Sequence, residues 1–276
     1  MKSITLLLSL FITSSIFAQS PWVKDQGDLF VNLSYSTISD YDELFGDPDY
    51  NLERTITDRT YQLYGEYGLT SKTTILINLP LKSIHIEDLA DPNVFSGTIP
   101  GTKTALGNIQ FGLKHQFYNK NWILAGQISA EINTSYYNND TGIRTGYDAA
   151  TITPLFLAGK SFGKNFFQSF VGLNIRSNNY SSNFKIGGEL GRNITRNFIL
   201  IGFINISESF KDGTIDLPFV NEQTALYVNN QEYAAYGLKG ILQFCDLGFT
   251  ASFANAFSGN NVPKQSAFSI GIFNTF

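Results

Sequence analysis

The feature that most constrains this chain is an alternation of apolar with polar or small residues, which recurs in run after run from residue 27 to the end. The run Ala105–Tyr118 is the clearest case, because Phe111 and Leu113 are each flanked by polar or small residues. Successive side chains of a β-strand point to opposite faces of the sheet. A period of two therefore predicts strands whose two faces meet different surroundings.

The alternating runs number about twelve, and the segments between them alternate in length. The runs are Gly27–Ile38, Thr57–Leu69, Thr73–Ile86, Ala105–Tyr118, Trp122–Asn133, Asp148–Lys160, Phe167–Arg176, Ser182–Arg192, Asn197–Glu208, Gln231–Gln243, Leu247–Phe257 and Lys264–Phe276. Short turns near residues 71, 120, 163, 194 and 245 alternate with mostly longer connections. A β-sandwich gives no reason for this sorting, whereas bacterial membrane barrels have short periplasmic turns and long outer loops. We expect an all-β, transmembrane, antiparallel up-and-down β-barrel of about twelve strands, with both termini periplasmic.

In two of these runs the sequence does not decide which residues face inward and which face outward. The run Asp148–Lys160 contains Pro154, which removes one donor from the hydrogen-bond ladder and predicts a bulge or a local break. The run Asn197–Glu208 is apolar on both faces for much of its length.

The composition agrees with a barrel and excludes other classes. After residue 20 the chain lacks the apolar run of about 20 residues that a membrane helix needs. A mean hydropathy of −0.06 is compatible with a barrel, because only alternate residues face lipid. The net charge of −4 gives no indication of nucleic-acid binding. Aromatic residues expected at the two membrane interfaces are Trp22, Tyr35, Tyr67, Phe117, Trp122 and Phe276.

The first 18 residues have the pattern of a secretory signal peptide. Lys2 is followed by the apolar segment Ile4–Phe17, and Ala18 is the expected residue before cleavage. We therefore expect two parts, a signal peptide over residues 1–18 and a barrel over residues 19–276. The first strand begins soon after the cleavage site, which leaves no room for a plug domain and argues against energy-coupled transport. Cys245 is the only cysteine and is interpreted as a free thiol without a function.

The sequence offers few residues for catalysis or metal binding. Ser83 and His85 share one face of a strand, but on that phase the face is the lipid-facing one, and a strand-end histidine is the favoured interpretation. His115 has no acid–base partner in view. An acidic loop could offer oxygen ligands to calcium, although its spacing matches no known calcium loop and a solvated loop is favoured. That loop contains Asp40, Asp42, Glu43, Asp47 and Asp49. We expect no enzyme activity, no catalytic residues, no metal site and no cofactor.

Charged residues on the inward phase are the candidate functional residues. They are Glu66, Lys82, Lys114, Glu131, Arg176, Lys185, Glu189 and Lys239. Two interpretations remain open: these side chains line a water-filled passage, or they pair and fill the interior. Barrels of about 8 strands are filled and those of about 16 leave a channel, so twelve strands do not decide between them.

The final run, KQSAFSIGIFNTF, ends on an aromatic residue and resembles the closing strand of bacterial outer-membrane barrels. Asn274 stands where that signal usually has an aromatic residue. The resemblance implies an outer-membrane location in contact with lipid, and recognition of the strand ending in Phe276 by the barrel-assembly machinery.

A second resemblance concerns the middle of the chain. The segment Leu106–Phe117 resembles a strand of the outer-membrane family named after the meta-pathway of phenol degradation, with Asn108 and His115 in place of the usual Asp and Tyr. The segments Gly146–Ala149 and Phe170–Asn174 are similar to the middle of that family. The composition and the Ala18-Gln19 junction also resemble secreted proteins of Bacteroidota. The family resemblance implies uptake of small, often hydrophobic, molecules.

These observations lead to a ranked set of functions. The first is a passive outer-membrane channel or transporter for small molecules. The alternative is a non-conducting barrel that stabilises the envelope or binds a partner through its loops, and a barrel hydrolase is third. The sequence does not indicate which solute passes or how many copies assemble.

Overall fold

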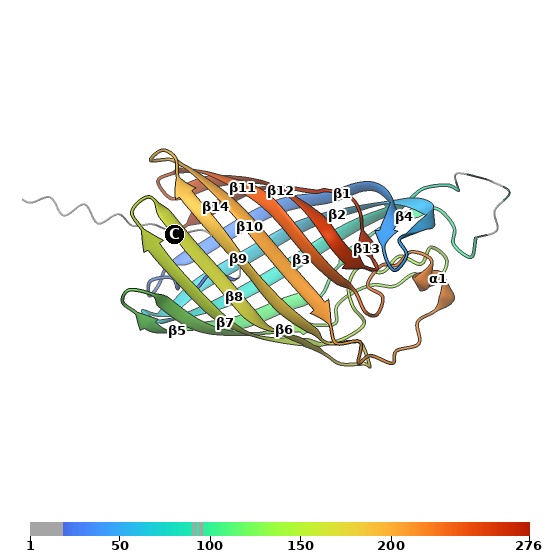
Figure 1. Cartoon of the computed structure of the whole chain (residues 1–276), viewed down its shortest axis with the longest axis horizontal. Coiled ribbons are helices and arrows are strands. Elements are labelled where there is room, and N and C mark those ends of the chain that lie inside the picture. Colours follow the sequence, from blue (N-terminus) through green and yellow to red (C-terminus); the bar gives the residue numbers. More distant parts are fainter. Residues whose placement is uncertain (1–18, 90, 92, 94–95) are drawn as a thin grey trace, which may run out of the picture.

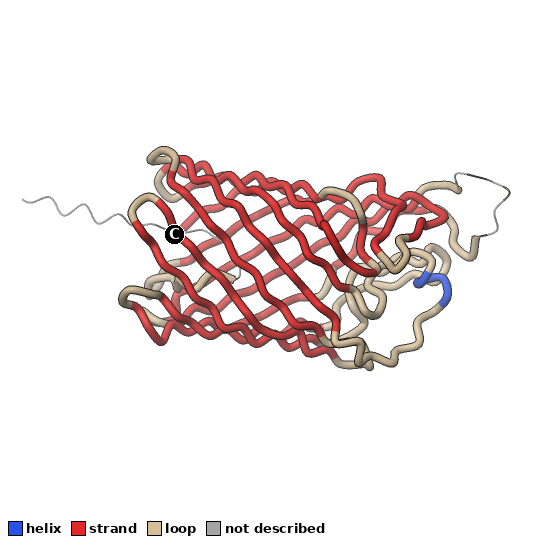
Figure 2. The backbone as a smooth tube through the Cα atoms, in the orientation of Figure 1, coloured by secondary structure: helices blue, strands red, loops and turns tan. Residues whose placement is uncertain are grey.

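A computed structural model describes residues 19–89, 91, 93 and 96–276. The predicted signal peptide, residues 1–18, lies outside the described residues. Within them, twelve long antiparallel strands form a closed barrel (Figures 1 and 2), which confirms the predicted architecture. The strands are β1 (Leu29–Phe45), β2 (Tyr50–Thr70), β3 (Thr73–Ile86), β5 (Ile109–Asn119), β6 (Ile123–Ile132), β7 (Thr151–Phe162), β8 (Asn165–Arg176), β9 (Asn183–Asn193), β10 (Phe198–Ser209), β11 (Glu232–Phe244), β12 (Leu247–Asn260) and β14 (Ala267–Thr275).

The barrel closes where the first strand pairs with the last. β1 and β14 are in register from Phe30 opposite Thr275 to Ile38 opposite Ala267. Two further backbone hydrogen bonds join Leu29 and Phe276. Closure leaves the sheet without an unpaired edge along the zone of β1–β14 pairing, which is the condition for a sheet in hydrocarbon.

The two faces of the strands differ as the alternation predicts. On β5, Phe111 and Leu113 point outward and are exposed, while the next residue, Lys114, is fully buried inside the barrel. On β10 the undecided phase is resolved, because Leu200 and Ile204 are exposed and Ile201 is buried. The outside of the barrel is therefore apolar and the inside carries polar groups.

Several strand boundaries differ from the sequence-based prediction. The polar segment Ser39–Thr55, which the prediction left as a connection between the first two strands, is mostly strand, because β1 continues to Phe45 and β2 starts at Tyr50. Register shifts interrupt the β1–β2 pairing between Ile38 and Tyr41 and between Tyr41 and Glu43, so the alternation fades although the strands persist. The short strand β13 (Val262–Pro263) pairs with the last residues of β1, Leu44 and Phe45.

The fourth predicted run is also divided. It begins in the last two residues of β4 (Gly101–Leu106) and continues in β5, and the two strands are separated at Gly107 and Asn108. The amide of Gly107 donates to the Pro80 carbonyl at 2.8 Å, and the Thr134 hydroxyl donates to the Gly107 carbonyl. Single contacts with β3 and with the loop after β6 thus replace the regular ladder at this point.

Pro154 produces the predicted local break and no bulge. β7 and β8 pair at Ile152–Ile175 and again at Leu155–Gly172, with no partners recorded between them and no change of register. Opposite β6, Pro154 pairs normally with Ile128. The missing amide donor of proline accounts for the gap on one side only.

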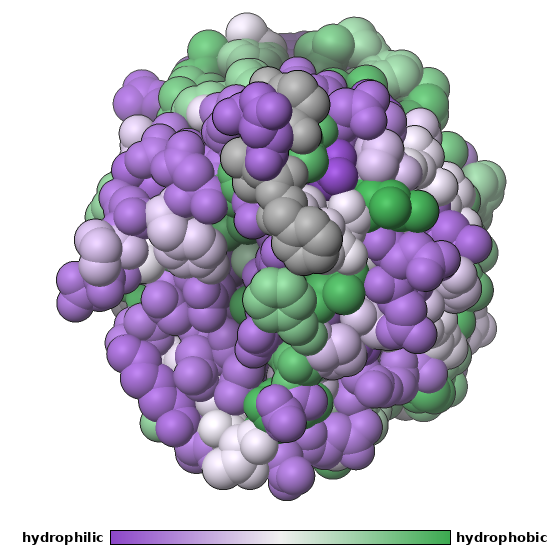
Figure 3. All heavy atoms as spheres, turned by 90° about the vertical axis from the view of Figure 1, so that its right-hand side faces the viewer, coloured by the Kyte–Doolittle hydropathy of each residue, from purple (hydrophilic) through white to green (hydrophobic). Residues whose placement is uncertain are grey.

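The long connections gather at one end of the barrel, shown on the right in Figure 1. The short helix α1 (Phe219–Glu222) belongs to the longest of them. Among the described residues, no helix is long and apolar enough to cross a membrane. Loop residues pack against the parts of β1, β2 and β3 that lie nearest the long connections. The buried cluster formed there consists of Tyr41, Leu44, Ile56, Ile84, Ile86, Ile143, Ala225, Leu226 and Val228. Seen onto this end, the surface is largely hydrophilic, with hydrophobic side chains gathered near its centre (Figure 3).

Candidate functional site

The interior of the barrel near the short turns is lined by an apolar layer. It consists of inward side chains from seven strands, namely Phe30, Tyr64, Leu76, Phe166, Ile201, Ile241 and Phe273. Trp22 packs edge-on against Phe166 in this layer, with ring centroids 6.2 Å apart. The prediction that Trp22 lies at a membrane–water interface on the outside of the barrel is therefore wrong, because the segment that carries it folds into the barrel.

The segment before β1 is attached to the inner wall. The Lys24 amide donates to the Thr74 hydroxyl at 2.9 Å, and the Gly27 amide donates to the Gly68 carbonyl at 2.9 Å. A side chain at Gly68 would overlap the Asp25 backbone, so the glycine permits this close approach. The described chain from Gln19 to β1 thus narrows the barrel interior.

Directly beside this segment lies a buried ionic cluster. Lys114 Nζ is 2.9 Å from Glu66 Oε1, and its side chain is fully buried. Lys24 Nζ approaches the other oxygen of Glu66 at 3.9 Å, and the Tyr64 hydroxyl donates to Glu66 at 2.8 Å. One carboxylate is therefore shared by two lysines and a phenol.

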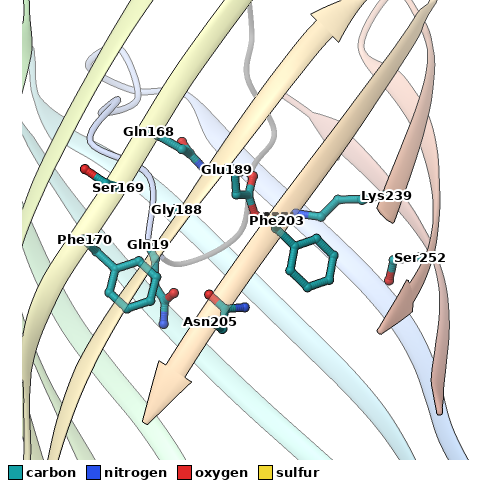
Figure 4. A pocket seen from close by; sticks show the side chains of 10 residues that line it. All are labelled: Gln19, Gln168, Ser169, Phe170, Gly188, Glu189, Phe203, Asn205, Lys239 and Ser252. Atoms are coloured by element: carbon teal, nitrogen blue, oxygen red, sulfur yellow. Dashed lines mark hydrogen bonds and ion pairs between the residues drawn. The ribbon is translucent and has the colours of Figure 1, made fainter. Parts of the chain in front are cut away.

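A central cavity of about 270 Å³ lies next to a second ion pair (Figure 4). Lys239 Nζ is 2.9 Å from Glu189 Oε1, and the Gln168 amide donates to Glu189 Oε2 at 2.9 Å. Gln19 of the N-terminal segment and the Phe203 ring also line this cavity. The cavity combines a charged wall with an aromatic one.

An upper cavity of about 250 Å³ lies nearer the long loops. Lys82, Glu131 and Arg176 line it, together with the aromatic loop residues Tyr147 and Tyr227. Lys82 forms an ion pair of 2.7 Å with Asp58, a neighbouring group outside the lining. Glu131 and Arg176 occupy one row of the barrel wall, because each is paired in register with Thr151 of β7.

The eight predicted interior charges separate into three groups. Glu66 and Lys114 lie nearest the short turns, and Glu189 and Lys239 lie in the centre. The group nearest the long loops consists of Lys82, Glu131, Arg176 and Lys185. Lys185 interacts electrostatically with both Glu131 and Arg176. The structure thus brings these residues together inside the barrel, while their role in lining a passage stays a prediction.

Sequence reasoning missed several members of these groups. Asp58 follows the same period-two phase as Glu66 and was detectable from that phase. Lys24, Tyr147 and Tyr227 lie outside the alternating runs, so no periodic signal marks them. With Asp58 and Lys24 included, the clusters contain six cations (Lys24, Lys82, Lys114, Arg176, Lys185 and Lys239) and four carboxylates (Asp58, Glu66, Glu131 and Glu189).

The candidate catalytic residues Ser83 and His85 form hydrogen bonds to a neighbouring strand and not to each other. His85 Nδ1 is hydrogen-bonded to the Thr102 hydroxyl at 2.7 Å, and Ser83 accepts a hydrogen bond from the Thr104 hydroxyl at 3.0 Å. Both contacts join β3 to β4. Among the described residues, no group of three or more His, Cys, Asp or Glu side chains is placed to hold a metal ion.

Solved structures share this fold at low sequence identity. An outer membrane channel from Pseudomonas putida F1 aligns with a TM-score of 0.71 and 13% identity, over 95% of this chain and all of that one. The translocator domain of the autotransporter NalP from Neisseria meningitidis aligns with a TM-score of 0.54 and 10% identity, over 92% of this chain and 90% of that one. The β domain of the Bordetella autotransporter BrkA gives 0.52 and 12%, over 91% and 100%. No family model and no curated protein matches the chain.

Proposed function

We propose that this protein is a passive outer-membrane channel for small molecules. The observation that carries the proposal is a closed twelve-strand barrel whose outer face is apolar and whose interior holds charged groups and two cavities. Such a barrel pairs its backbone amides within the sheet and exposes apolar side chains to lipid. The shared fold with a known outer membrane channel supports the proposal.

The arrangement of the loops supports an orientation for the barrel. The C-terminus and the short turns lie at one end, and the long loops at the other (Figure 1). We assign the short-turn end to the periplasm, which is the arrangement of bacterial outer-membrane barrels. Export by the signal peptide and recognition of the strand ending in Phe276 by the assembly machinery complete the proposed route.

The interior charges support a preference among solutes. Six cations and four carboxylates give the interior clusters a net charge of 6 − 4 = +2, although the whole chain has a net charge of −4. Cationic side chains along a passage favour anions. The apolar layers at both ends favour solutes that also carry an apolar part, in agreement with the resemblance to a family of hydrophobic-molecule transporters.

Single-channel recording of the refolded protein in planar bilayers tests the proposal. We expect stable conductance steps with a preference for chloride over potassium. Glu131→Gln should increase that preference and Lys185→Gln should decrease it, because both groups lie in the upper cluster. Lys264→Gln, which alters a cation in the outer loops, serves as the matched control. A folded barrel that neither conducts ions nor admits uncharged solutes into liposomes would contradict the proposal and favour a non-conducting barrel.

A further inference from the structure

The upper cavity carries an excess of positive charge. Lys82 is neutralised by Asp58 at 2.7 Å. The remaining charges around the cavity are Glu131, Arg176 and Lys185, which leave a net charge of +1. Among the described residues, no ion pair within 4.0 Å joins Glu131 to either cation. An uncompensated charge in surroundings of low polarity is costly, and a bound anion removes that cost.

Arg176 is positioned with donor capacity in reserve. Its Nη1 donates to the Ser181 carbonyl at 2.8 Å and to the Asn183 side-chain oxygen. Its Nε–H is buried and has no hydrogen-bond partner among the described residues. A guanidinium has five N–H donors in a fixed fork that matches a carboxylate. The wall contacts therefore fix the guanidinium and leave a donor for a ligand.

Aromatic rings form another part of the cavity wall. Tyr147 and Tyr227 both line the cavity, and their ring centroids are 5.3 Å apart at an angle of 83°. The Arg176 guanidinium lies 4.0 Å from the Tyr147 ring centroid, so a cation and an aromatic surface are adjacent. A flat ring can pack edge-to-face or in an offset stack on such tyrosines.

We propose that the upper cavity is a binding site for a small carboxylate that carries one aromatic ring. The carboxylate accepts hydrogen bonds from Arg176 and is attracted by Lys185, while the ring packs on Tyr147 and Tyr227. The size is suitable, because the cavity measures about 250 Å³ and a cavity of about 150 Å³ is known to hold benzene. As the identity of a transported solute, this inference rests on the proposed channel function, whereas the binding itself does not.

Titration calorimetry of the folded protein in detergent micelles at pH 7, with benzoate as the probe, tests the site. We expect saturable benzoate binding. Benzyl alcohol retains the ring without the charge and acetate retains the charge without the ring, so each should bind at least tenfold more weakly. The loss of a charge-assisted hydrogen bond in Arg176→Gln should weaken benzoate binding about tenfold or more. Lys185→Gln, which leaves the Arg176 contacts in place, should weaken it by a smaller factor.

Lys239→Gln is the matched control, since it removes one interior cation at the central cavity and not at the upper one. Its benzoate affinity should equal that of the unaltered protein. Equal weakening in all three variants would overturn the site and indicate a general effect of interior charge. Absent benzoate binding, or equal binding of benzyl alcohol, would also overturn it. Conductance recorded in parallel separates the two ideas, because conduction without benzoate binding refutes only the site, and binding without conduction refutes only the channel.

Discussion

The ionic cluster at Glu66 permits a prediction about which of its members matters most for stability. Glu66→Gln leaves the fully buried Lys114 and the largely buried Lys24 without their shared carboxylate. Lys114→Gln leaves Glu66 with Lys24 at 3.9 Å and with the Tyr64 hydroxyl at 2.8 Å. The carboxylate change therefore strands two cations, and the lysine change strands no unpaired charge.

The magnitude follows from the cost of breaking a buried ion pair. Removing one partner costs about 3–5 kcal/mol, because the other charge stays buried without compensation. We expect the free energy of unfolding to fall by about 5 kcal/mol in Glu66→Gln and by less than about 3 kcal/mol in Lys114→Gln, because Glu66 then keeps Lys24 and the Tyr64 hydroxyl as partners. The double variant should lose less than Glu66→Gln alone, since Lys24 is then the only charged member of the cluster.

Equilibrium unfolding in urea, with the barrel refolded in phospholipid vesicles, measures these differences. Gel mobility of the heat-resistant folded form provides a readout that is independent of Trp22, which lies beside the cluster. Lys239→Gln is the matched control, because its Glu189 partner is more exposed than Glu66 and its loss should cost less. If Lys114→Gln destabilises the barrel as much as Glu66→Gln, or if both cost less than about 1 kcal/mol as exposed pairs do, the argument from shared pairing is wrong.

Three further predictions concern other parts of the barrel. Trp22→Ala removes the aromatic contact with the apolar layer, so we expect a larger single-channel conductance and a stability loss of about 3 kcal/mol. Gly248→Ala should destabilise folding by about 1–3 kcal/mol in urea unfolding, because its Cβ would overlap the Phe273 ring. A hydrogen bond from the Lys264 ammonium, and to a smaller extent one from the backbone N–H of Gly46, holds the pKa of Asp49 below its usual 3.8. The contact with Lys264 stabilises the outer hairpin above pH 3.8, and this stabilisation is lost as the pH falls through the lowered pKa of Asp49. An NMR titration of the Asp49 carboxyl carbon measures that pKa.

Two of these predictions have a control, and the third has a result that would contradict it. Gly126→Ala introduces a Cβ with no atom within 4 Å and should leave stability unchanged or slightly increased. Lys264→Gln should return the pKa of Asp49 toward 3.8. An unaltered conductance in Trp22→Ala would show that the N-terminal segment does not limit passage.

The alternation of residues was sufficient to predict the barrel, and the reason is visible in β5. Lipid on one side and polar neighbours on the other impose opposite requirements on Leu113 and Lys114, so the sequence records the face of each residue. In the hairpin from Ser39 to Thr55, register shifts between Ile38 and Glu43 interrupt the period of two, so the strand ends were misplaced. The local alternation therefore predicts strands only where the ladder is regular.

The interior site was only partly predictable. The strand residues Lys82 and Arg176 were identified from their phase. Tyr147 and Tyr227 reach the same cavity from two loops that are distant in sequence, and no period connects them. Lys24 reaches Glu66 because its segment folds back into the barrel, which depends on long-range packing and not on local pattern.

The pairing of β1 with β14 also has a consequence for how the chain can fold. Apart from the short strands β4 and β13, every other pairing joins strands that follow one another, so hairpins can form from local segments. The closing seam joins Phe30 to Thr275 and requires nearly the whole chain as its loop. Because the entropic cost of loop closure rises only by about 0.6 kcal/mol per doubling of length, the seam is affordable once the hairpins have shortened the effective loop. Folding should therefore be nearly all-or-none with respect to the last strand, and a chain truncated before β14 would expose two long unpaired edges that invite pairing with other chains.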